Sequence, residues 1–139
     1  MTPVLTLLVY MTLLTWLALL LASLIRAKGW TLPGMLLALG NRENMPEASA
    51  LAGRADRAAR NTLEGFVLFA ALALAAEVSG VQSVRIELGS ELFFWSRLLY
   101  LPIYYFGIAY LRTGVWTVGM VGLALMALEL LQAGAAVAR

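Results

Sequence analysis

The 139 residues include no cysteine and no histidine. The missing cysteines exclude disulfide bonds and a protein thiol as a nucleophile, and both absences together remove the side chains from which most zinc sites are built. Without histidine the chain also has no imidazole for acid–base catalysis near neutral pH. We therefore expect no metal site, and any thiol chemistry must come from a bound ligand.

The chain also contains few charged residues. They make up 13% of the chain, against 62% hydrophobic residues, and the mean hydropathy is +0.84, whereas soluble domains are about half apolar and a quarter charged. This composition is typical of a membrane protein, and the length predicts one domain. The formal net charge is only +2, and the basic residues are not spread along a polar groove, so we expect no nucleic acid partner.

Four apolar stretches are long enough to cross the hydrocarbon core of a bilayer, which takes about 20 residues as a helix. They predict an all-α integral membrane protein in which residues 1–139 form a single four-helix transmembrane bundle. A long polar connection follows the first stretch. The polar triplet Arg112-Thr113-Gly114 predicts a tight turn that makes the last two stretches an antiparallel hairpin. The expected spans are residues 3–26, 57–79, 91–111 and 114–137.

The distribution of basic residues predicts how the chain crosses the membrane. The flank before the first span has no Lys or Arg, which is the reverse of a cleaved signal peptide, so we expect this segment to be a span. Loops with an excess of Lys and Arg are cytoplasmic, so the first loop is expected in the cytoplasm, with both termini outside. The expected cytoplasmic basic residues are Arg26, Lys28, Arg42, Arg54, Arg57, Arg60 and Arg112, against Arg85 and Arg139 on the other side.

A first polar face lies at the start of the second expected span and consists of Arg57, Arg60, Asn61 and Glu64. The spacing i, i+3, i+4, i+7 puts these side chains on one side of a helix. Two cations, an amide and a carboxylate would match a small zwitterion with carboxylates and an ammonium group. The alternative is a helix end at which the arginines reach lipid headgroups and Glu64 pairs with Arg60.

A second polar face, formed by Arg97, Tyr100 and Tyr104, lies in the third expected span. An ionisable residue inside an apolar run needs a partner. The favoured packing interpretation is a buried pair between Arg97 and Glu129 of the fourth span. The alternative partners of Arg97 are Glu64 and a ligand carboxylate. The two tyrosines are either packing residues or ligand contacts.

Arg112 follows the third apolar run. Its simplest role is a positively charged anchor at the cytoplasmic surface. Its functional role would be to hold a thiolate or another anion.

Two segments resemble a known family. RAARNTLE (57–64) and RLLYLPIYYFGIAYLRTGVW (97–116) are similar to the MAPEG family, the membrane-associated proteins in eicosanoid and glutathione metabolism. The resemblance implies a homotrimer of four-helix bundles and, for a bacterial-type member, a bacterial inner membrane. It also implies that glutathione binds as a co-substrate at the subunit interface, beside a lipid-facing groove for a hydrophobic substrate.

The resemblance further implies roles for single residues. The first polar face would hold the glutathione backbone, and the second would complete the pocket. Arg112 would match the arginine that activates the thiol, helped by the Tyr104 hydroxyl, and Arg26 would reach the ligand of the neighbouring subunit. The implied site consists of Arg26, Arg57, Arg60, Asn61, Glu64, Arg97, Tyr100, Tyr104 and Arg112.

Three functions are compatible with these patterns. The first is that of a glutathione transferase or peroxidase acting on lipophilic electrophiles through a thiolate stabilised by arginine. The second is that of a noncatalytic membrane protein that holds a lipid or another ligand in the same groove. The third is a purely structural bundle whose polar faces pair internally.

Overall fold

The computed structural model describes residues 1–138, which are all-α. Three of the helices, α1, α3 and α5, are long and apolar enough to cross a membrane. Arg139, one of the two basic residues expected outside, lies beyond the described residues. The helices are α1 (Pro3–Ala27), α2 (Leu32–Leu39), α3 (Ala50–Ser79), α4 (Val84–Tyr105) and α5 (Ala109–Val137).

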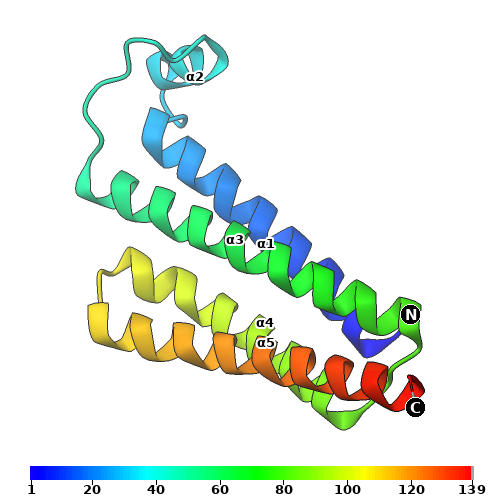
Figure 1. Ribbon diagram of the computed structural model, residues 1–139. Coiled ribbons are helices and arrows are strands. Elements are labelled where there is room, and N and C mark those ends of the chain that lie inside the picture. The colour runs from blue at the N-terminus through cyan, green and yellow to red at the C-terminus, as the bar shows by residue number, and fades with distance from the viewer. Residues whose placement is uncertain (139) are drawn as a thin grey trace.

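The long helices pack as two pairs, α1 with α3 and α4 with α5, and α3 also contacts both helices of the second pair (Figure 1). Each pair is antiparallel, and the two chain ends lie at the same end of the molecule. We call this end the terminal end. The opposite end, here called the loop end, holds α2, the start of α3 and the connection between α4 and α5.

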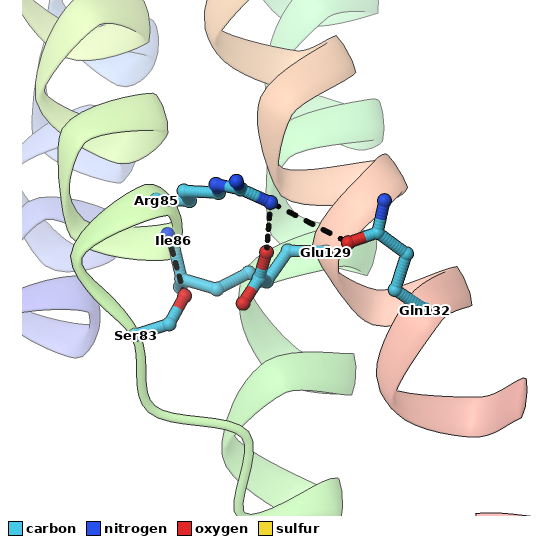
Figure 2. Close-up of polar contacts among 5 residues, drawn as sticks. All are labelled: Ser83, Arg85, Ile86, Glu129 and Gln132. Atoms are coloured by element: carbon cyan, nitrogen blue, oxygen red, sulfur yellow. Dashed lines mark hydrogen bonds and ion pairs between the residues drawn. The ribbon is translucent and has the colours of Figure 1, made fainter. Parts of the chain in front are cut away.

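Local capping explains where the helices begin. Ser49 accepts a hydrogen bond from the Ala52 N–H, and Ser83 accepts one from the Ile86 N–H (Figure 2). A serine at this position satisfies a backbone donor that the helix itself leaves free. Because of these caps, α3 begins seven residues before the expected span at residue 57, and α4 begins seven residues before residue 91. The first two turns of α3 contain Gly53 and the charged residues Arg54 and Asp56, so the apolar stretch was expected to begin after them.

The turn expected at Arg112-Thr113-Gly114 is wrong. The chain turns at Gly107, whose φ of 74° lies in the left-handed region that glycine tolerates best. The Ile108 N–H donates to the Ile103 carbonyl and the Gly107 N–H to the Tyr104 carbonyl, which is the pattern of a Schellman helix end. The apolar run continues through this turn to Leu111, so hydropathy conceals it. Arg112 therefore lies in the first turns of α5 and does not close α4.

The long polar connection expected after the first span also needs correction. It contains the eight-residue helix α2, which begins after Thr31, whose hydroxyl accepts from the Gly34 N–H. This stretch is short and apolar, so neither the span length nor a polar loop pattern predicted it.

The largest apolar core lies toward the terminal end. There Phe69 of α3 stacks on Phe93 of α4 with ring centroids 4.8 Å apart. Toward the loop end the contact between α1 and α3 is made by alanines, and tyrosines of α4 take the place of the aliphatic core. Large apolar side chains thus fill one half of the molecule, and the polar residues gather in the other. The buried apolar residues of the largest core are Val4, Met11, Phe69, Ala73, Ala76, Ile86, Phe93, Leu123 and Met126.

The expected pair between Arg97 and Glu129 is wrong. Arg85 Nη1 lies 3.3 Å from Glu129 Oε2 and 3.4 Å from Gln132 Oε1, so Glu129 is paired at the terminal end (Figure 2). Arg97 is twelve residues further along α4, which is about 18 Å in a helix. The register of α4 against α5 explains the difference, because Ser96 lies opposite Gly119 rather than Glu129.

Candidate functional site

The second polar face of α4 turns inward at the loop end. Arg97, Tyr100 and Tyr104 are all buried, and the two tyrosine rings meet edge to face with their centroids 5.4 Å apart. The Arg57 Nε–H of α3 donates to the Tyr104 hydroxyl over 3.2 Å. The helical spacing predicted from the sequence therefore places these side chains together, and α3 faces them.

Arg97 is the most unusual residue of this cluster, because it is a cation with only 1% of its surface exposed. Its Nη1 donates to Asn61 Oδ1 of α3 over 2.7 Å. Its guanidinium carbon lies 5.1 Å from the centre of the Tyr100 ring and 5.3 Å from that of Phe93. Its Nε is buried without a hydrogen-bond partner among the described residues. A neutral amide and two rings solvate the charge, and within residues 1–138 no carboxylate forms an ion pair with it.

Gly65 makes room for this arginine. A Cβ atom at Gly65 would lie 2.9 Å from Arg97 Nη2 and 3.1 Å from its guanidinium carbon. Such distances are shorter than ordinary contacts, so any larger residue would displace the guanidinium. The close approach of α3 to the Arg97 head therefore depends on this glycine.

Arg112 reaches the cluster from α5. Its guanidinium carbon lies 4.4 Å from the centre of the Tyr104 ring, which is a favourable cation–π distance. A cavity of about 180 Å³ opens between α3, α4 and α5 beside it. Its polar lining and the nearby cations suit a small polar anion. The cavity is lined by Asn61, Tyr100, Arg112, Thr113 and Trp116.

Comparison with known proteins identifies the family. A family model described as the MAPEG family matches residues 3–132 of the 139-residue chain. The chain belongs to the MAPEG family. No curated protein matches the sequence. MAPEG membership and the three apolar helices make this chain an integral membrane protein, of a family concerned with glutathione or eicosanoid metabolism, whose members generally use glutathione and form oligomers.

Six of the nine residues implied by the MAPEG resemblance lie in this cluster. The other three do not join it within residues 1–138. Arg60 is exposed and pairs with Asp56 one helical turn away, with 3.1 Å between Nε and Oδ2. Glu64 is exposed on α3, and Arg26 is half-buried near the end of α1. The six that meet are Arg57, Asn61, Arg97, Tyr100, Tyr104 and Arg112.

Three residues of this candidate site were not predicted from the sequence. The sequence places Thr113 in a turn and gives Trp116 no role, yet both line the cavity. Placing the turn at Gly107 would have put Arg112 and Trp116 four positions apart on one helix face, which is the signal that could have found them. Gly65 could not be found in this way, because its role depends on where Arg97 lies.

Proposed function

We propose that this MAPEG protein binds glutathione at the loop end and uses it as a transferase or peroxidase on lipophilic substrates. The observation that carries the proposal is the group of three guanidiniums, from Arg57, Arg97 and Arg112, around two tyrosines. Among residues 1–138 the only ion pairs are Arg60–Asp56 and Arg85–Glu129, so no protein carboxylate neutralises this group. A buried cation without a counter-ion is costly unless a ligand supplies the anion.

Glutathione has the groups that this surface needs. It carries two carboxylates, an ammonium group and a thiol, and guanidiniums bind carboxylates through charge-assisted hydrogen bonds. The unpartnered Nε of Arg97 and the polar cavity beside Arg112 are compatible with such a ligand. Glu64, exposed on the same helix as Asn61, has the charge to hold the ammonium group.

Arg112 is the residue we assign to the thiol. A free thiol of this type has a pKa of about 8.5, so only a few per cent is ionised at neutral pH. A guanidinium and the Tyr104 hydroxyl next to the sulfur would favour the thiolate, and the N-terminal end of α5 adds positive potential from the helix dipole. Lowering the thiol pKa by one unit needs only about 1.4 kcal/mol.

The proposed reactions follow from that thiolate. In conjugation, the thiol proton passes to solvent, the sulfur forms a bond to an electrophilic carbon, and the leaving group departs with its electron pair. In peroxide reduction, two glutathione molecules are oxidised to the disulfide, while the hydroperoxide is reduced to an alcohol and water. Both reactions need a lipophilic substrate to approach the sulfur from the membrane.

We also propose four membrane crossings, although α4, unlike α1, α3 and α5, has no 18-residue stretch apolar and uncharged enough to count as a span by composition. The C-terminal end of α3 and the N-terminal end of α5 lie at opposite ends of the molecule (Figure 1). If both helices cross the bilayer, the chain between them must cross as well, and α4 is that segment. With the basic loop end in the cytoplasm, both termini lie outside, and the membrane would be a bacterial inner membrane.

A homotrimer would complete the site. Arg60 and Glu64 are exposed on α3 while their neighbours Asn61 and Arg57 contact α4. A second subunit packed on this side of α3 would enclose the ligand, and Arg26 from that subunit would be available to it. We propose this shared site because Arg60 and Glu64 are exposed on α3 and because MAPEG proteins form oligomers.

A second candidate function is noncatalytic binding of a lipid-like ligand. An apolar groove of about 230 Å³ lies along α4 and α5, and its size and lining suit an acyl chain. It is lined by Leu88, Glu91, Leu92, Trp95, Ser96, Leu99, Val115 and Val118.

Binding and turnover measurements separate these functions. Purified protein in nanodiscs is titrated with glutathione by calorimetry and then assayed with an aryl halide and with a lipid hydroperoxide. Binding with turnover supports the enzyme, whereas binding without turnover supports the noncatalytic function. Absence of glutathione binding contradicts the transferase or peroxidase proposal and leaves the polar faces as internal packing.

A further inference from the structure

Helix α2 is apolar and has little protein around it. Leu32, Leu36 and Leu39 are 74%, 63% and 78% exposed, and Trp30 just before the helix is 71% exposed. Among the helices of residues 1–138, α2 contacts only α1. Eight residues form a helix about 12 Å long, which is too short to cross a bilayer. An apolar surface of this kind needs an apolar partner.

Backbone conformation and backbone contacts fix the position of α2 relative to α1. Lys28 adopts a left-handed conformation with φ 51°, and the Gly29 N–H donates to the Leu24 carbonyl over 2.9 Å. Gly34 packs directly against the carbonyls of Ala27 and Lys28 with no room for a Cβ atom. The start of α2 is therefore held against the last carbonyls of α1.

Basic residues outnumber acidic ones around α2, where Glu43, next to Arg42, is the nearest acidic residue. The sequence has no Asp or Glu before Glu43, whereas Arg26, Lys28 and Arg42 flank the helix. Arg42 folds back over it, since its Nε donates to the Ala38 carbonyl and its Nη2 to the Ser23 hydroxyl over 2.8 Å. Basic residues next to an apolar helix are attracted to anionic lipid headgroups.

We propose that α2 is an interfacial helix that binds the surface of the same bilayer that α1 crosses. Its leucines and Met35 enter the boundary between headgroups and acyl chains, Trp30 lies at headgroup level as interfacial tryptophans do, and Arg26, Lys28 and Arg42 bind anionic phosphates. The lipid surface is favoured as occupant because α2 continues directly from a membrane-crossing helix and carries the complementary charge. The proposal is independent of what the polar site binds.

The absence of cysteine makes a direct test possible, because a single introduced cysteine carries a unique spin label. The label is placed at Leu36→Cys, with Asn44→Cys in the exposed loop as the aqueous control and Leu74→Cys on the exposed side of α3 as the lipid control. Accessibility to oxygen, which concentrates in lipid, is compared with accessibility to a water-soluble nickel chelate. The protein is held in nanodiscs of phosphatidylcholine with phosphatidylglycerol, and circular dichroism confirms that each variant keeps its helices.

We expect the label at Leu36 to respond more to oxygen than to nickel, as at Leu74, and the label at Asn44 to show the reverse. A Leu36 label as accessible to nickel as the Asn44 label would place α2 in water and overturn the proposal. Low accessibility to both reagents would show that protein, such as a second copy of the chain, covers α2, and would also overturn it.

A separate experiment tests whether anionic lipid contributes to the binding of α2. In nanodiscs of phosphatidylcholine alone, we expect nickel accessibility at Leu36 to rise, and the same rise should follow from Lys28→Ser with Arg42→Ser in the anionic nanodiscs. No change in either comparison would overturn the role of anionic lipid.

Discussion

Arg97 Nη1 and Asn61 Oδ1, 36 positions apart in the chain, are 2.7 Å apart and join α4 to α3 inside the protein. The partner is a neutral amide, so the hydrogen bond orients the guanidinium and leaves its charge available. The arginine is held by Asn61 on one side and given room by Gly65, one helical turn further along α3. A charge held in this way is ready for an anionic ligand.

Replacing Asn61 with Asp tests whether the free charge is used. The new carboxylate would pair with Arg97 and compete with the ligand, so we expect glutathione affinity to fall at least about tenfold, or about 1.4 kcal/mol. The apo protein should melt at the same or a higher temperature, because the buried cation gains a counter-ion. Calorimetry and thermal melting measure the two effects. Unchanged affinity in the paired variant would show that Arg97 does not meet the ligand.

Gly65→Ala tests the space around Arg97. The added methyl group would lie 2.9 Å from Arg97 Nη2 and should displace the guanidinium, weakening glutathione binding by roughly tenfold. Gly134→Ala is the matched control, because a Cβ there meets nothing within 4 Å and alanine in a helix is favoured by roughly 0.5–1 kcal/mol. Equal effects of the two substitutions on binding would contradict the assigned role.

Arg112→Ala tests thiol activation. Removing the guanidinium beside the Tyr104 ring should raise the pKa of bound glutathione by about one unit or more, so the thiolate fraction near neutral pH falls about tenfold. The ultraviolet absorbance of the bound thiolate measures this fraction, and calorimetry should show only a modest loss of affinity. Arg112→Lys should restore part of the thiolate, since it returns the charge without the planar fork. A thiolate signal unaffected by Arg112→Ala would assign the activation to another residue.

Glu129→Gln tests the corrected pairing at the terminal end. Arg85 is largely exposed, with 63% of its side chain accessible, so the pair should contribute no more than about 1 kcal/mol to stability. We expect a small fall in melting temperature and unchanged glutathione affinity. A large loss of glutathione binding would contradict this pairing and would indicate that Glu129 interacts electrostatically with Arg97.

Mixed oligomers test the shared site. Subunits carrying Arg26→Ala are combined with subunits carrying Arg112→Ala, each expected to be weakly active alone. If Arg26 acts on the neighbour's ligand, some interfaces in the mixture have both arginines intact and activity should partly return. Activity no higher than the average of the two parents would contradict a site completed by the next subunit.

Periodicity predicted much of the local structure. The spacing of Arg97, Tyr100 and Tyr104 correctly put them on one side of a helix, and Asn61 lies on the α3 side that faces them. Hydropathy also gave the approximate spans, but it did not show that α3 begins at Ala50, ahead of the charged residues Arg54 and Asp56, or that Gly107 ends α4 inside an apolar run. Caps and left-handed glycines, rather than apolar content, decide these boundaries.

The sequence by itself determined that the protein is an all-α membrane protein without a thiol or an imidazole of its own, because composition and helical period are properties of short segments. Only the tertiary structure decided which charges meet: Arg97 with Asn61 over Gly65, and Arg85 with Glu129. These pairings depend on the register between helices, which is set by contacts such as Ser96 opposite Gly119. A shift of one turn between α4 and α5, about 5.4 Å, would separate Arg85 from Glu129 while leaving every helix unchanged.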